Sequence, residues 1–98
     1  MVDSTLVFEG MMAAARVFKQ DASRARKAGD ASLAETRSYD ADDVENAVLS
    51  FKATGDLGQL VRSIMDFDTE PREIVLEKLV EKVGREPLEA TGEVKFLR

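Results

Sequence analysis

The sequence predicts a mainly α-helical fold, a small bundle of one long N-terminal helix and three shorter helices within a single domain, residues 1–98. Three observations predict this fold. Apolar side chains recur at intervals of three and four residues, which is the period of one helix face. Glycine and proline number only six and two, and aromatic residues are few. This composition favours helices over a sandwich of short strands.

The long helix is predicted at residues 4–28. Asp3 or Ser4 would cap its start, and Gly29 suits the position just after its end. A short strand at residues 5–8 is the alternative, because Gly10 is a poor residue for a helix interior. The regular spacing favours the helix, and it places on one face the residues Val7, Met11, Ala14, Phe18, Ala22 and Ala25.

Capping residues divide the centre of the chain into three shorter predicted helices, at residues 41–53, 57–66 and 71–83. Asp40 would cap the first of these, and Gly55 would end it. Asp56 would cap the second. Pro71 fits the first turn of the third, which Gly84 would end.

Two segments stay open in this prediction. Residues 30–39 form either a short turn or a continuation of the long helix after a kink. The C-terminal tail, residues 88–98, includes an alternating stretch around Val94 and Phe96 that is compatible with a short strand. Its partner would be residues 36–39 or another chain.

The length of the first helix predicts where the core lies. At about 1.5 Å per residue this helix is about 37 Å long, whereas a compact domain of this size is about 32 Å across. Large apolar side chains occur in its first half, residues 6–18, and only alanines follow among basic residues. We therefore expect the core on the first half, and an exposed or projecting second half at residues 19–28.

Charge is distributed unevenly along the chain, whose net charge is −5. Residues 1–38 carry six basic and five acidic side chains, and residues 39–98 carry eight basic and fourteen acidic ones. Residues 11–29 have a net charge of +4, because a single aspartate accompanies Arg16, Lys19, Arg24, Arg26 and Lys27.

The composition argues against most enzyme classes. Histidine and cysteine are absent, which removes the commonest general base and the usual transition-metal ligands. The acidic run that starts at Asp40 lacks the glycine and glutamate of a calcium-binding loop, and no phosphate-binding loop is present. We expect no enzyme activity, cofactor, metal or small-molecule substrate. We also expect a cytoplasmic protein, because no apolar run reaches the length of a membrane span.

These features favour a non-enzymatic protein-protein interaction module, acting as an assembly subunit, adaptor or regulator of a larger complex. Self-association is expected, through the +4 segment of one copy and the acidic half of another. The alternatives are nucleic-acid binding through the basic half of the long helix, or inhibition of another protein by occupying its basic groove. The predicted partner-binding residues are Arg16, Lys19, Ala22, Arg24, Ala25, Arg26, Lys27, Leu49, Ile74, Val94 and Phe96.

Overall fold

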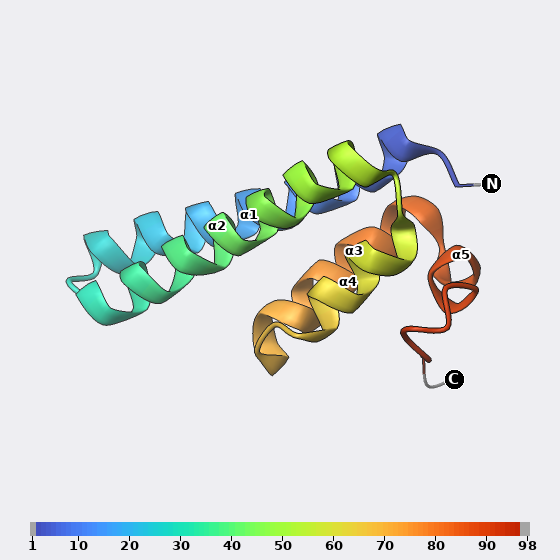
Figure 1. The fold of residues 1–98 in the computed structure, drawn as a ribbon. Helices are drawn as coiled ribbons and strands as arrows, with labels where there is room; N and C mark the ends of the chain where they lie inside the picture. The colour runs from blue at the N-terminus through green and yellow to red at the C-terminus, as the bar shows by residue number, and fades with distance from the viewer. Residues whose placement is uncertain (1, 97–98) are drawn as a thin grey trace.

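The structure, a computed structural model, describes residues 2–96 and confirms that the fold is mainly helical. Figure 1 shows the helices in chain order. No strand occurs in the described part of the chain, so the C-terminal strand is not observed. The helices are α1 (Ser4–Lys27), α2 (Ala31–Thr54), α3 (Leu57–Met65), α4 (Thr69–Val83) and α5 (Arg85–Glu89).

Helices α1 and α2 form a long antiparallel hairpin (Figure 1). The turn between them is built on Gly29, which has a φ of 81°. The N–H of Gly29 donates to the carbonyl of Arg26 at 3.1 Å, and that of Asp30 donates to the carbonyl of Ala25 at 2.8 Å. Asp30 then starts α2, because its carboxylate accepts from the N–H of Leu33 at 3.0 Å. The chain therefore reverses direction within three residues.

The prediction for the second helix was wrong in its start. The helix begins at Ala31 and has 24 residues, as many as α1. Asp40, expected to cap it, lies in its interior, where its carboxylate accepts from the guanidinium of Arg37 at 3.1 Å. The polar segment that could have been a turn is helical because it packs along the second half of α1.

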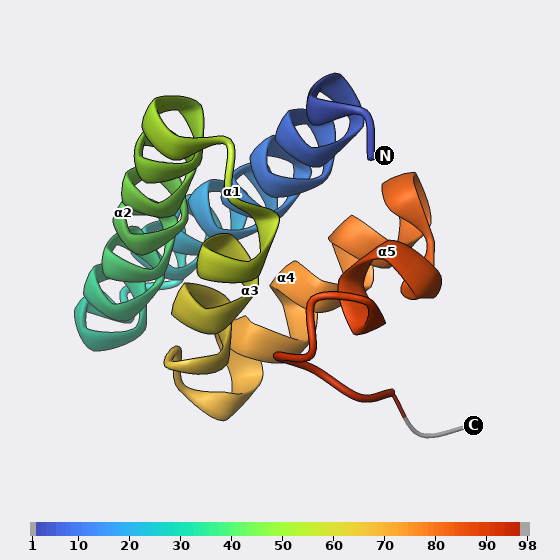
Figure 2. The same cartoon turned by 45° about the vertical axis from the view of Figure 1, so that its right-hand side comes forward.

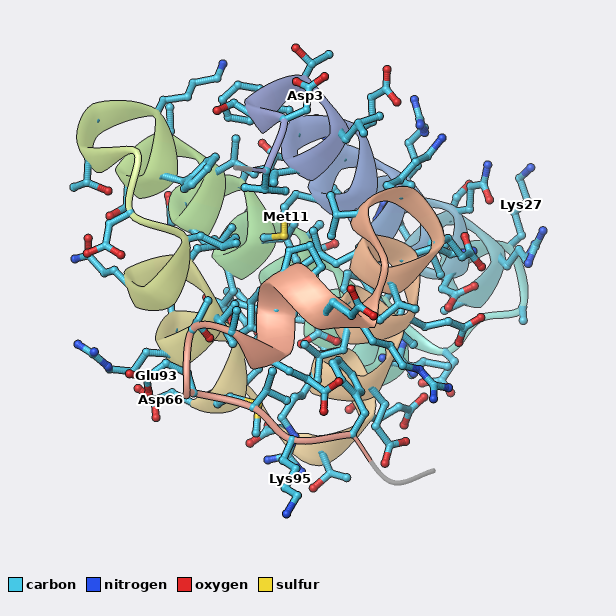
Figure 3. The ribbon with its side chains drawn as sticks, turned by 90° about the vertical axis from the view of Figure 1, so that its right-hand side faces the viewer. Asp3, Met11, Lys27, Asp66, Glu93 and Lys95 are labelled. Atoms are coloured by element: carbon cyan, nitrogen blue, oxygen red, sulfur yellow. The ribbon has the colours of Figure 1, made fainter. Side chains whose placement is uncertain are left out.

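The shorter helices α3 and α4 pack on one side of this hairpin, and α5 lies against both of them (Figure 2). The core lies where they meet the first half of α1. Met11 points into the space between the helices (Figure 3). The expected location of the core is confirmed: the α1 residues of the core cluster run from Val7 to Phe18. The end of the hairpin that carries the α1–α2 turn extends beyond α3 and α4 (Figure 1).

Gly10 lets α4 approach α1 closely. Asp3 caps α1 by accepting from the N–H of Thr5 at 2.8 Å, so the alternative of a strand at residues 5–8 was wrong. Gly10 is buried within this helix. A Cβ atom there would lie 3.1 Å from the Cα of Leu79 and 3.1 Å from the carbonyl oxygen of Lys78. Both are backbone atoms, so a larger side chain at residue 10 must push α4 away.

Replacing Gly10 with valine is expected to lower the free energy of unfolding by about 2–3 kcal/mol, because overpacking displaces α4. Gln20→Val is the matched control, since Gln20 is exposed on the same helix and its replacement costs about 0.5 kcal/mol in helix propensity. Urea unfolding followed by circular dichroism measures both. Equal losses in the two variants would contradict the close contact.

Residues 85–96 fold back over α3 and α4 in a way that the sequence did not predict. The short helix α5 is anchored by Leu88, which is fully buried. Beyond it, the carboxylate of Glu93 accepts from the guanidinium of Arg62 on α3 at 2.8 Å. Figure 3 shows Glu93 on the segment that follows α5.

The Arg62–Glu93 pair should be visible in a carboxylate titration. The hydrogen bond from Arg62 lowers the pKa of Glu93 below its ordinary value. Because the pKa of Glu93 is lowered on folding, its ionised carboxylate stabilises the fold at any pH above the ordinary pKa of glutamate. This stabilisation is lost as the pH falls through the pKa that Glu93 has in the folded state. In Arg62→Gln, nuclear magnetic resonance titration should show the pKa of Glu93 moving upward. Lys95→Gln, which removes an exposed charge from the same tail, should leave it nearly unchanged; the reverse pattern would refute the pairing.

Candidate functional site

The outer face of the hairpin, the side turned away from α4, carries two stripes of residues spaced by seven. We call this surface the hairpin face. A spacing of seven residues is nearly two helical turns, so each stripe runs along one side of its helix. The α1 stripe is Met12, Lys19 and Arg26, and the α2 stripe is Glu35, Asp42 and Leu49.

Contacts on the opposite side of each helix establish which way this face points. Gly10 meets α4, and Met12 follows it by two residues, or about 200° around the helix. Arg37 reaches Glu70 on α4, and Glu35 precedes it by the same interval. The two stripes therefore lie on the side of the hairpin that α3 and α4 leave uncovered.

The apolar end of the hairpin face is formed by Met12 and Leu49. Leu49 is 63% exposed and Met12 is 38% exposed, which is high for large apolar side chains. Together with Glu45, Val48 and Lys52 they line a hollow of 210 Å³. An exposed apolar pair with a polar rim is typical of a protein contact.

The other end of the hairpin face is polar and contains both signs of charge. Arg26 from α1 lines a hollow of 380 Å³ with Glu35, Tyr39 and Asp42 from α2. The hydroxyl of Tyr39 donates to Glu35 at 3.1 Å, and this bond to a carboxylate raises the pKa of Tyr39. Between the two ends, the ammonium of Lys19 lies 2.6 Å from the carboxylate of Glu45. The face thus has a basic edge on α1 and an acidic edge on α2.

The predicted basic residues of α1 are all exposed, and Figure 3 shows Lys27 pointing outward. Lys19 pairs with Glu45, and Arg24 lies 3.6 Å from Asp21. The other three make none of the ion pairs found within residues 2–96; they are Arg16, Arg26 and Lys27.

The expectation that the alanine side of α1 is uncovered was wrong. Ala22 is 1% exposed and Ala25 is 5% exposed, because the first half of α2 packs against them. Their small side chains allow this close approach within one chain. Neither alanine is therefore available to a partner in this structure.

The remaining predicted residues divide into two groups. Leu49 is exposed as expected, on the hairpin face. Ile74, Val94 and Phe96 are half-buried against the core cluster. Phe96 also borders a hollow of 370 Å³ along α4, where the guanidinium of Arg85 lies 5.8 Å from the centre of its ring. The structure does not bring these three residues together with the hairpin face.

A partly buried ion-pair cluster around Arg37 was missed by the sequence analysis. The guanidinium contacts Asp40 on its own helix, Asp21 on α1 and Glu70 on α4. It also lies over the ring of Phe18, 5.8 Å from the centre. Arg37 continues the buried series of Ala34, Ala41 and Val44, and this spacing is the signal that could have revealed it. Through these three carboxylates, Arg37 links α1, α2 and α4.

Within the described residues, no group of three or more acidic side chains is arranged to hold a metal ion. None of the helices described has the length and apolar character needed to cross a bilayer. Comparison with protein-family models, with curated proteins and with solved structures found no match.

Proposed function

We propose that this protein is a non-enzymatic interaction module that binds protein chains through the hairpin face, as a subunit, adaptor or regulator of an assembly. The observation that carries the proposal is the exposure of Leu49 beside Met12. Two large apolar side chains from two helices share one hollow, on the side that the rest of the fold leaves uncovered. Burying them against a partner would be favourable by the hydrophobic effect.

Nucleic-acid binding is less well supported by the same surface. A binder of phosphates needs a concentration of basic side chains with few acids nearby. Helix α2 instead places Glu35 and Asp42 in the same hollow as Arg26, and Glu45 against Lys19. Carboxylates of α2 therefore partly neutralise the basic edge of α1, which favours a protein partner with mixed charge.

Site-specific photocrosslinking in the cells that make the protein would test the proposal. A photoreactive phenylalanine analogue is placed at Leu49, and in a control chain at Gln59, which is exposed on α3. We expect an adduct with an identified protein chain from position 49, absent from position 59 and lost on adding Met12→Asp. No adduct from position 49, or equal adducts from both positions, would refute the role of the hairpin face.

A further inference from the structure

We infer that the partner of the hairpin face is a second copy of this chain, with α1 of each copy lying on α2 of the other. This inference rests on the proposed function and names its partner. The two hairpins would then stack face to face as a four-helix bundle, related by a two-fold axis that runs parallel to the helices.

Charge is the first argument. Helix α1 carries five basic and two acidic side chains, a net charge of +3. Helix α2 carries two basic and five acidic side chains, a net charge of −3. A two-fold axis parallel to the helices places each basic helix over the acidic helix of the second copy. An axis across the helices would place like over like, which repulsion disfavours.

The register of the hairpin supports the same arrangement. A two-fold axis parallel to the helices keeps every residue at its own height. Met12 and Leu49 border one hollow and are therefore level with each other, so Met12 of one copy meets Leu49 of the second. Arg26 and Glu35 are likewise level at the other end. The same two-fold rotation therefore buries Met12 and Leu49 and places opposite charges against each other.

The size of the hairpin face fits a modest dimer. A helix of 24 residues is about 36 Å long and each helix is about 10 Å wide, which gives about 700 Å² on each copy. Standard protein interfaces bury about 800 Å² on each partner. Because few large apolar side chains lie on this face, we expect an association that weakens as salt screens the charges.

Charge-swapped variants test the arrangement. One chain carries Lys19→Glu with Arg26→Glu, and another carries Glu35→Lys with Asp42→Lys. In sedimentation equilibrium at low salt, the dissociation constant of each variant alone should be at least about tenfold higher than that of the unaltered chain, because like charges then face each other. An equimolar mixture should recover association, since both contacts are complementary again. A monomeric unaltered chain, or variants that associate as well as it does, would overturn the inference.

The absence of cysteine from these 98 residues allows a second test that does not depend on the charge variants folding. Chains with Met12→Cys are mixed with chains carrying Leu49→Cys and exposed to a mild oxidant. A disulfide between the two kinds of chain should form several-fold faster than one within either kind alone. Equal rates, or no bond between them, would contradict α1 lying on α2.

These tests separate the two proposals. If position 49 gives adducts only with a different protein and the cysteine chains do not join, the self-association inference fails and the interaction face stands. If position 49 gives no adduct at all, the proposed function fails as well.

Discussion

Replacing Arg37 with leucine is expected to lower the free energy of unfolding by about 2–4 kcal/mol at neutral pH. The Arg37 side chain is only 10% exposed, and that of Asp40, its partner on the same helix, is 12% exposed. Leucine would leave that carboxylate in a poorly solvated position without a positive charge. It would also remove the link from α2 to Glu70 on α4. Urea unfolding at constant ionic strength measures the loss.

The pH dependence gives this prediction a sign. Burial raises the pKa of Asp40 despite the opposing effect of Arg37. A pKa raised on folding means that the folded state binds the proton more tightly, so stability falls as the pH rises through that pKa. Without Arg37 the pKa of Asp40 is raised further. The loss in free energy of unfolding caused by Arg37→Leu should therefore shrink as the pH falls towards the pKa of Asp40, where the carboxyl group takes up a proton. A penalty that does not change with pH would contradict the assignment.

Two control variants separate the buried pair from its exposed neighbour. Glu70→Gln should cost less than about 1 kcal/mol, because the Glu70 side chain is 69% exposed and water screens its charge. Arg37→Leu combined with Asp40→Leu should recover much of the loss, since it removes both buried charges together. A double variant as unstable as Arg37→Leu alone would show that the penalty arises from lost packing.

Helix ends were predicted well where local capping chemistry decides them. Asp3, Gly29, Asp56 and Gly84 occupy the expected positions at the ends of α1, α3 and α4. These signals depend on a few neighbouring residues, so the sequence alone carries them. The position of the core on the first half of α1 was also predictable, because large apolar side chains are confined there.

The start of α2 could not be predicted in this way, because two aspartates were suitable caps. Both Asp30 and Asp40 precede segments with helical spacing. The choice depends on tertiary packing, since the polar first half of α2 becomes helical along Ala22 and Ala25 of α1. Missing this contact also led to the wrong expectation that these alanines are uncovered. The helix α5 was missed because five residues with one buried leucine have no period to detect.

The candidate site was predictable only in part for the same reason. Leu49 was recognised because it falls off the apolar stripe of its own helix, and the structure shows it exposed. Met12 was not recognised, because its position beside Leu49 depends on the height at which α1 and α2 pair. The position of Glu35 and Asp42 beside Arg26 also follows from that pairing. The surface is a property of two helices together, and neither segment shows it alone.

Phe18→Ala is expected to have the largest effect of any single change, a loss of about 3–5 kcal/mol in the free energy of unfolding. Phe18 has no exposed surface and is the largest of the fully buried side chains. It marks the end of the core along α1, since only small side chains are buried between the helices beyond it, apart from Arg37. Removing the ring leaves a cavity where the hairpin leaves the bundle and takes away the aromatic face beneath Arg37. Thermal and urea unfolding measure the loss.

Tyr39→Ala is the matched control, because it removes an aromatic ring that is 60% exposed on α2. It should change the free energy of unfolding by no more than about 0.5 kcal/mol. Because Tyr39 borders the polar hollow of the hairpin face, it should still weaken association at protein concentrations where Phe18→Ala, if folded, does not. Equal destabilisation by the two variants would contradict the separation between a core on one side of the hairpin and an interaction surface on the other. In the proposed arrangement, the two helices stabilise the fold with one face, and the opposite face remains uncovered for a partner.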